Sequence, residues 1–408
     1  MRFAGRLVVI AGVMFVAGLA VSLSLSGSGL PVPRAHAAAH RRGVYAVSLA
    51  QRVRAQSLGR RADHALPLRP FSATAFEPAD SGRHPEGTRE TAAVSANCER
   101  RQGGRTFTAQ RADAAASYPW PLKPFDRQHP IRGNFGDPRT FLLTSASSVR
   151  PAGRFSFHGG VDIVGKVGEP VFPVVSGRVV RARPDRIYVR SGSRLLDYWH
   201  LRSAVRLGEW VGAQRTVLGF IRPEWRHVHL GEAIDGRQVN PLLHLTPYAD
   251  STAPVVAGVR FVDGAGRTLD PLHLHGLIEI AAGVYDLPSP PVPGAWSNTP
   301  VAPALVQSQL TTLDGRTVLP KRTAVDFRWT LPEGKAAFWQ VYAHDTYQNF
   351  PVVGLHYFYR QPGNYLFRLT RAPLDTRRLA PGRYQLIVDA ADICGNHSSF
   401  TEQITTAR

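Results

Sequence analysis

The chain has 408 residues, of which 43% are hydrophobic and 19% are charged. At roughly 150 residues per domain, this length allows two or three domains with cores of their own. The low charged fraction, together with 37 glycines and 32 prolines, disfavours a coiled coil or a helical bundle. It favours β-structure with many turns.

The formal net charge is +19, from 49 Lys and Arg against 30 Asp and Glu. A basic surface favours anionic partners, whether nucleic acid, lipid or an acidic wall polymer. No nucleic-acid fold signature accompanies the charge, so we expect no nucleic-acid partner. The two cysteines, Cys98 and Cys394, cannot form a cysteine-based zinc site, so any metal must be held by His, Asp or Glu.

The amino terminus has the pattern of an export signal. Residues 1–6 carry two arginines, residues 7–25 are apolar or small, and Ala35-His36-Ala37 offers a cleavage site. This predicts a cleaved secretory signal over residues 1–37 and a secreted protein. The alternative is a membrane anchor formed by residues 7–25, and we expect membrane contact only through such an uncleaved signal. Whether Cys98 and Cys394 form a disulfide outside the cytoplasm is left undecided by the sequence.

Residues 38–117 show no sustained hydrophobic periodicity and contain several arginine pairs. This composition predicts a flexible, basic linker that is disordered. Whether the linker holds the rest of the chain latent stays open.

From Pro130 to Pro247, short β-type runs alternate with Gly and Pro. Such spacing is typical of an antiparallel all-β domain, which we expect over residues 118–247. The predicted strands are Val161–Val164, Pro170–Val175, Gly177–Ala182, Arg186–Val189, Thr216–Ile221 and His227–Ala233. Asn240-Pro241 closes the domain, and the prolines at 247 and 254 bound a short linker.

A second β-rich region follows over residues 254–408. Its predicted strands are Val255–Phe261, Leu277–Ala281, Val325–Trp329, Gln340–Ala343, Tyr365–Leu369 and Arg383–Ala390. The turn, alternating strand and turn over residues 379–396 suit the last hairpin of an immunoglobulin- or fibronectin-like β-sandwich. We expect an insertion around residues 284–320. Asp286 and Asp392 stand near strand ends, where turn-capping aspartates are common, so no calcium site is predicted there.

Three short motifs in residues 118–247 carry chemistry. His158 and Asp162 are four residues apart across Gly159-Gly160, and a curved strand would let both converge on one ion. His227 and His229 are two apart, so a strand presents both imidazoles on one face. Tyr198-Trp199-His200-Leu201 adds another imidazole. Three N/O ligands plus an open position are what a catalytic zinc requires.

These motifs, in this order, resemble the lysostaphin/LytM-type zinc metallo-endopeptidases, which cut peptides of the bacterial cell wall. The matching residues span 130–245, just over a quarter of the chain. They are Gly133-Asn-Phe-Gly136-Asp-Pro-Arg139, His158-x-x-x-Asp162, the expected core hairpin Gly168–Val180, Tyr198-x-His200-Leu201, Gly208-x-x-Val211, His227-x-His229 and Asn240-Pro241. The resemblance implies a duplicated hybrid motif β-sandwich.

The resemblance also implies roles for individual residues. His158, Asp162 and His229 would ligate one zinc ion (Zn²⁺), and His200 and His227 would be the catalytic histidines beside a metal-activated water. Which of the two histidines is the base stays open. Asn134, Tyr198 and Trp225 are weaker candidates for the substrate groove. The implied substrates are the peptide stems or cross-bridges of peptidoglycan, with anionic cell-wall polymers as further partners.

One departure from the family concerns the loop before His227. Ile221-Arg-Pro-Glu-Trp-Arg226 replaces the usual loop rich in Gly, Ser and Thr. This leaves two alternatives: a catalytically silent or latent wall-binding module that regulates other cell-wall hydrolases, and a secreted protease of host or prey proteins. The second His-x-His, His273 and His275, has no partner motifs in its own region, so these two residues and His244 are predicted to be structural.

Overall fold

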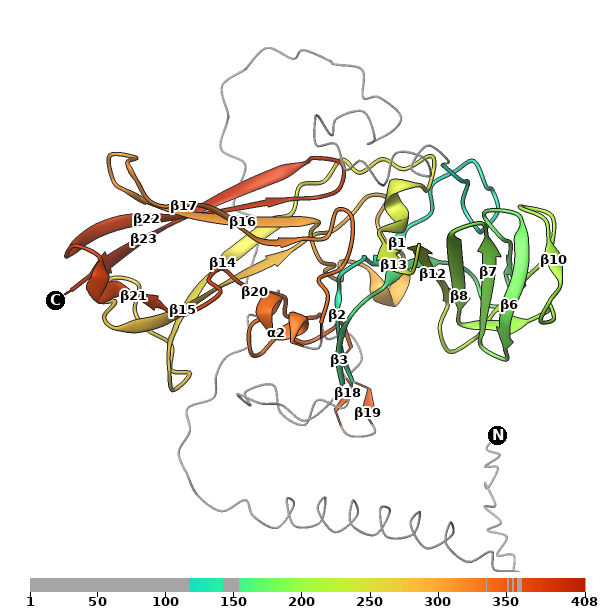
Figure 1. Ribbon diagram of the computed structural model, residues 1–408, viewed down its shortest axis with the longest axis horizontal. Helices are drawn as coiled ribbons and strands as arrows, with labels where there is room; N and C mark the ends of the chain where they lie inside the picture. Colours follow the sequence, from blue (N-terminus) through green and yellow to red (C-terminus); the bar gives the residue numbers. More distant parts are fainter. Residues whose placement is uncertain are drawn as a thin grey trace, which may run out of the picture. The chain divides into compact units, whose positions relative to one another are not determined.

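The computed structural model describes residues 117–141, 154–334, 336–350, 352–353, 356–357 and 362–407. The predicted export signal and the predicted linker except its last residue lie outside these ranges, as does Cys98. Over the described ranges, no helix is long and apolar enough to cross a membrane. The fold is all-β, and the strands that pair with one another are antiparallel (Figure 1).

The largest sheet has eight strands, and its order brings the predicted metal motifs side by side. The order is β1 (Ile131–Gly133), β4 (Gly160–Val164), β12 (His227–Ile234), β8 (Arg194–Trp199), β7 (Arg186–Ser191), β6 (Gly177–Arg183) and β10 (Trp210–Val211), with β13 (Arg237–Val239) paired to β12. Figure 1 shows β6, β7 and β8 as neighbouring green strands. Along β8, burial alternates with a period of two, so Leu196 and Tyr198 face the core.

A three-stranded sheet covers this core with β5 (Pro170–Val171), β11 (Gly219–Ile221) and β9 (Leu201–Ser203). Val171, Leu201 and Ile221 of this sheet join Leu196 and Tyr198 in one buried cluster. The prediction of a hairpin over Gly168–Val180 is wrong. Its two strands, β5 and β6, belong to different sheets, and the chain passes from one sheet to the other between them. The predicted strands Pro170–Val175 and Thr216–Ile221 are shorter, as β5 and β11.

The region after residue 254 contains two four-stranded sheets. One consists of β14 (Val255–Asp263), β15 (Leu277–Tyr285), β20 (Leu366–Arg368) and β21 (Leu374–Asp375), and the other of β17 (Thr317–Asp326), β16 (Leu305–Thr312), β22 (Gly382–Ala391) and β23 (His397–Thr406). Ile280 and Phe367 of the first share a core with Val306 and Val388 of the second. The predicted final hairpin is confirmed as β22–β23; an immunoglobulin-like topology stays a prediction.

Three expectations for this region are wrong. Residues 340–343 were expected as a strand, but α2 (Ala337–Val341) occupies the first half of this stretch, with Phe338 and Val341 buried at helical spacing. The strand expected over residues 325–329 ends at Asp326. The expected insertion does not reach residue 320, because β16 lies between β17 and β22 inside a sheet. The short elements are η3 (Pro241–Leu243), η4 (Gly294–Trp296), η5 (Thr376–Arg378), β18 (Val352–Val353) and β19 (His356–Tyr357).

The hairpin of β2 (Pro138–Phe141) and β3 (Arg154–Phe157) packs on the core of the second region. The ring centre of Phe155 lies 5.6 Å from that of Phe338, and the ring centre of Phe157 lies 5.5 Å from that of Phe327. Next to the hairpin, Gly136 has a φ of +93°, and a Cβ on it would overlap the Phe327 ring. The segment before His158 is therefore held by residues from the second region.

Candidate metal centre

Strand register brings the predicted ligands together. β12 pairs with β4 so that His229 stands opposite Asp162, while the other edge of β12 pairs with β8. His158 enters from the end of β3, directly before the Gly159-Gly160 step into β4. A Cβ on Gly160 would overlap the Leu230 carbonyl, so this glycine is required for β4 to lie against β12.

Three ligand atoms converge on one point. His158 Nε2 lies 2.7 Å from His229 Nδ1 and 3.1 Å from Asp162 Oδ1, and the last two atoms are 3.3 Å apart. All three residues are less than 9% exposed. Ligands in a tetrahedral shell at about 2.0–2.1 Å from zinc are about 3.3 Å apart. The two distances to Asp162 Oδ1, 3.1 and 3.3 Å, are close to this spacing, and the distance between the two nitrogens, 2.7 Å, is shorter.

Neighbouring groups leave these atoms without hydrogens. His158 Nδ1–H donates to the Asn134 carbonyl at 2.9 Å, so a neutral imidazole presents the lone pair of Nε2. Nε2 of His229 faces Asp197 Oδ1 at 3.7 Å, which favours the tautomer with a lone pair on Nδ1. Burial and then the charge of Arg139 lower the pKa of His158 to about 3, which keeps it neutral. Two nitrogen lone pairs and a carboxylate oxygen thus face one another, and a cation fits between them.

Two charged residues support the ligands from behind. Arg139 Nη2 holds Asp162 Oδ2 at 2.9 Å, which leaves Oδ1 for the ion. Gly133 stands opposite Asp162, and a Cβ on it would come within 2.7 Å of Asp162 Oδ2. On the other side, Asp197 lies across Gly231 of β12, where a Cβ would overlap Asp197 Oδ1. Arg139 stood in the motif that carries the family resemblance, but nothing in the sequence assigned it or Asp197 a role.

The two predicted catalytic histidines lie beside this centre. His227 Nε2 is 3.5 Å from Asp162 Oδ1, and its Nδ1–H donates to the Trp225 carbonyl at 2.7 Å. The ring centres of His200 and His227 are 4.6 Å apart. His200 has a φ of 71° at the bend between β8 and β9, a backbone conformation that few residues other than Gly adopt. Burial lowers the pKa of His200 to about 2 and also lowers that of His227, so both are neutral at pH 7.

Arg132 is a site residue that the sequence reasoning missed. It lies on β1, its guanidinium carbon is 3.4 Å from the centre of the Trp296 ring, and its Nη1 donates to the Trp225 carbonyl at 3.4 Å. Its Nε is buried without a hydrogen-bond partner over the described ranges. Burial lowers its pKa to about 10, which leaves it charged at pH 7. The short helix η4 of the second region therefore contributes Trp296 near the metal centre.

The weaker groove candidates have different positions. Trp225 stacks on His200 with ring centres 4.0 Å apart and an interplanar angle of 25°. Asn134 supports His158 through its carbonyl and donates Nδ2–H to the Ala302 carbonyl. Tyr198 is fully buried, with its hydroxyl accepting the Val174 N–H. A side chain in the core cannot line a groove, so the assignment of Tyr198 does not hold.

The histidines predicted to be structural lie away from the centre. His244 is buried and binds Glu232 through Nδ1 at 2.8 Å. His273 and His275 are exposed, and His273 pairs with Asp270. They lie in a turn and the residues after it rather than in a strand. The same His-x-His spacing thus forms a metal-type cluster only where β4 and β8 flank it.

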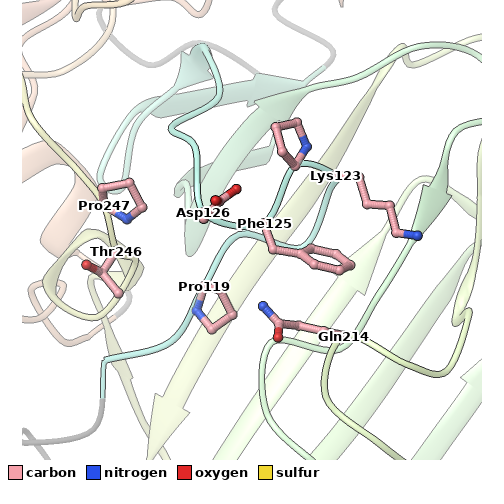
Figure 2. Close-up of a pocket in the computed structure, with 8 residues that line it drawn as sticks. Pro119, Lys123, Phe125, Asp126, Gln214, Thr246 and Pro247 are labelled. Carbon is pink, nitrogen blue, oxygen red and sulfur yellow. The ribbon is translucent and has the colours of Figure 1, made fainter.

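A pocket of about 760 Å³ lies elsewhere, beside the segment that contains Lys123 and Phe125 (Figure 2). Gln214 and Pro247 line it as well, and Figure 2 shows the Phe125 ring lying between Lys123 and Gln214. None of the predicted site residues is among those that line it. This pocket is therefore separate from the histidine cluster.

No family model and no curated protein sequence matches the chain. Solved structures match part of it. A chain of the SpoIIQ-SpoIIIAH pore forming complex is 22% identical, covers 32% of this chain and 91% of that chain, and gives a TM-score of 0.25. A zinc containing peptidase from Vibrio cholerae is 23% identical and covers 31% of this chain and 39% of its own, with a TM-score of 0.24.

The catalytic domain of the prophage-encoded M23 protein EnpA from Enterococcus faecalis is 24% identical. It covers 25% of this chain and 88% of its own, with a TM-score of 0.19. M23 peptidases are thus among the proteins to which part of this chain is similar. The assignment of the site rests on its own side chains.

Proposed function

We propose that this chain is a secreted zinc-dependent endopeptidase that hydrolyses peptide bonds in bacterial peptidoglycan. The observation that carries the proposal is the convergence of His158 Nε2, Asp162 Oδ1 and His229 Nδ1 beside two further neutral imidazoles. Three protein ligands, rather than four, suit a catalytic zinc rather than a closed structural one.

His158, Asp162 and His229 would hold the zinc ion. Zinc bound there would supply a Lewis acid that polarises the scissile carbonyl and lowers the pKa of water. Arg139 keeps Asp162 oriented through Oδ2. The Asn134 carbonyl fixes the tautomer of His158. These contacts hold the ligand atoms in place before substrate arrives.

The remaining imidazoles can move the proton. His227 donates Nδ1–H to the Trp225 carbonyl, so its Nε2 is the atom that accepts a proton from the attacking water. His200, neutral and 4.6 Å away between ring centres, can donate an N–H to the oxyanion that forms on the carbonyl. Arg132 on β1 adds a positive charge that acts on both His200 and His227. This charge is suited to a carboxylate of the peptide.

The substrate and the location are supported by the sequence. The order of motifs resembles the lysostaphin/LytM-type enzymes, the first 37 residues have the pattern of an export signal, and the net charge of +19 favours an anionic wall. A membrane anchor formed by residues 7–25 would place the same site at the membrane surface.

The test compares the full chain with His229→Ala and His227→Ala, measuring bound zinc and the fragments released from purified peptidoglycan. We expect His229→Ala to lose both zinc and activity. We expect His227→Ala to retain zinc and lose about 10²–10⁴-fold in rate. His275→Ala is the matched control, because this exposed histidine has the same spacing and should leave both readouts unchanged. A wild-type chain that binds no zinc would refute the proposal.

A silent regulatory module is the second candidate, and one observation favours it. Trp225 stacks on His200 and so covers one face of a ring that the proposed reaction uses. A wild-type chain that binds zinc but releases no fragments from any wall, or from a soluble Gly-rich peptide, would favour this candidate. If Trp225→Ala then released fragments, the chain would be a latent enzyme rather than a silent one.

A further inference from the structure

Three aspartates from separate segments meet below the surface. Asp250 lies in the connection before β14, Asp286 follows β15 and Asp392 follows β22. They are 8%, 1% and 4% exposed, and each offers a carboxylate oxygen within 4.8 Å of the other two. Asp286 and Asp392 do cap turns, as predicted, by accepting the N–H groups of Leu287 and Asn396. No sequence pattern indicates that Asp250 joins them.

The charges of these carboxylates act on one another. Burial, and next the charge of Asp250, raises the pKa of Asp286 to about 8. Burial is also the largest cause that raises the pKa of Asp392 to about 7, and Asp250 adds to it. Adjacent buried carboxylates are costly unless positive charge lies among them. The cluster therefore has the electrostatic character of a cation site.

One oxygen of the cluster is buried without a hydrogen bond. Asp250 Oδ1 accepts four hydrogen bonds, from the backbone N–H and the hydroxyl of both Thr252 and Ser289, at 2.7–3.0 Å. Asp250 Oδ2 has no partner over the described ranges, although the residue is only 8% exposed. The four bonds fix the carboxylate and leave Oδ2 as the oxygen free to bind an ion.

A small cavity adjoins the cluster. Its volume is about 10 Å³, and Asp286, Asp392, Tyr248 and Asn134 are among the residues that line it. This is about the room that a single water-sized occupant needs. The Oδ1 atom of Asn134 is also buried without a hydrogen-bond partner over the described ranges. Over the described ranges, Asp250 Oδ2 in the cluster and Asn134 Oδ1 in the cavity lining are thus buried oxygens without hydrogen bonds.

We propose that Asp250, Asp286 and Asp392 bind a calcium ion, with Asn134 Oδ1 as a further oxygen ligand. Calcium takes 6–8 oxygen ligands in flexible geometry, including carboxylates and amide carbonyls. Zinc prefers nitrogen and sulfur ligands, and magnesium keeps several waters in a strict octahedron. An all-oxygen cluster with three carboxylates matches calcium best.

The ion would join four parts of the chain. The Asp250 carbonyl accepts the Asn396 Nδ2–H at 2.7 Å, and the Asp250 N–H donates to Cys394 Sγ at 3.3 Å. Asn134 supplies the carbonyl that fixes His158. Calcium bound here would tie the connection, the ends of β15 and β22 and the segment behind the candidate metal centre together. This inference does not depend on the proposed peptidase activity.

The test measures thermal unfolding of the full chain after chelation and dialysis, then after addition of CaCl₂ alone. We expect the melting temperature to rise by about 5 °C or more at 100 times the Kd. We expect terbium(III) luminescence excited through tyrosine, with Tyr248 beside the cavity, and its displacement by calcium. For Asp286→Asn we expect no response to calcium, because an amide replaces one of the three carboxylates.

Three variants make the result specific. Asp270→Asn removes an exposed turn cap and should retain the full calcium response. His229→Ala should also retain it, which separates this site from the zinc centre. Asp250→Asn repeats the test if Asp286→Asn fails to fold.

Two outcomes would overturn the proposal. The first is a melting temperature of the wild type that does not change up to about 10 mM calcium, well above the Kd of typical extracellular calcium modules. Protonated carboxylates without an ion would then explain the cluster. The second is an equal shift with magnesium at the same concentration, which would overturn the assignment to calcium.

Discussion

Replacing Asp197 by Asn tests whether the residue behind His229 supports metal binding. Asp197 Oδ1 lies 3.7 Å from His229 Nε2, and the side chain is 19% exposed. A carboxylate in this position fixes the tautomer of the ligand and increases its basicity, and its loss typically weakens metal binding 10–100-fold. At 1.4 kcal/mol per factor of ten, this corresponds to about 1.4–2.8 kcal/mol.

The assay is competition for zinc between the full chain and a chromophoric chelator, together with thermal unfolding of the metal-free protein. Asp197 Oδ1 has no hydrogen-bond partner over the described ranges, so we expect the amide to leave metal-free stability unchanged or higher. Asp326→Asn, which removes a carboxylate paired with Arg328 in another sheet, is the control and should not alter zinc affinity. An unchanged zinc Kd in Asp197→Asn, or a loss that only parallels lower metal-free stability, would refute the reasoning.

Three further changes test the surroundings of the centre. Gly231→Ala should weaken zinc binding as Asp197→Asn does, because its Cβ would displace Asp197 Oδ1; intact affinity in the same competition assay would contradict this. Gly136→Ala should lower the free energy of unfolding in urea by roughly 2–5 kcal/mol, because its Cβ would stand at a φ of +93° and overlap Phe327. A loss below about 1 kcal/mol would show that the Phe327 ring moves aside easily. Tyr118→Phe removes the 2.8 Å hydrogen bond to buried Glu232 and should cost about 1–3 kcal/mol in the same experiment, with zinc affinity unchanged. A loss of zinc affinity in Tyr118→Phe would mean that the Glu232 network supports the centre.

The sequence predicted those parts of the fold that local patterns determine. The strands near residues 161–164, 177–182 and 227–233 are present. Gly160 and Gly177 stand where the first two begin, and Val228 and Leu230 alternate with the histidines in the third. The expected strand at 340–343 is wrong because four residues cannot separate a period of two from one of 3.6. Phe338 and Val341, both buried in α2, decide the outcome through packing.

For the site, the sequence predicted residues that share a motif and missed those that act across strands. His227 and His229 follow from alternation in one strand. Arg132 and Asp197 reach the centre because β1 and β8 pair in a particular register with β4 and β12. Arg139 reaches it from β2, which pairs with β3. The meeting of Asp250 with Asp286 and Asp392 depends on tertiary structure alone, so no spacing in the sequence could indicate it.

The β2–β3 hairpin has a consequence for how this protein can evolve. It begins at Pro138 and ends at Phe157, next to His158, while its aromatic side chains pack on Phe327 and Phe338 of the second region. A recombination event that replaced the second region with an unrelated sequence would leave these rings in water and free the residue before a metal ligand. The two regions are therefore expected to be inherited as a pair. Transfer of the first region to another scaffold should succeed only if Phe327 and Phe338, on which the hairpin packs, are transferred with it.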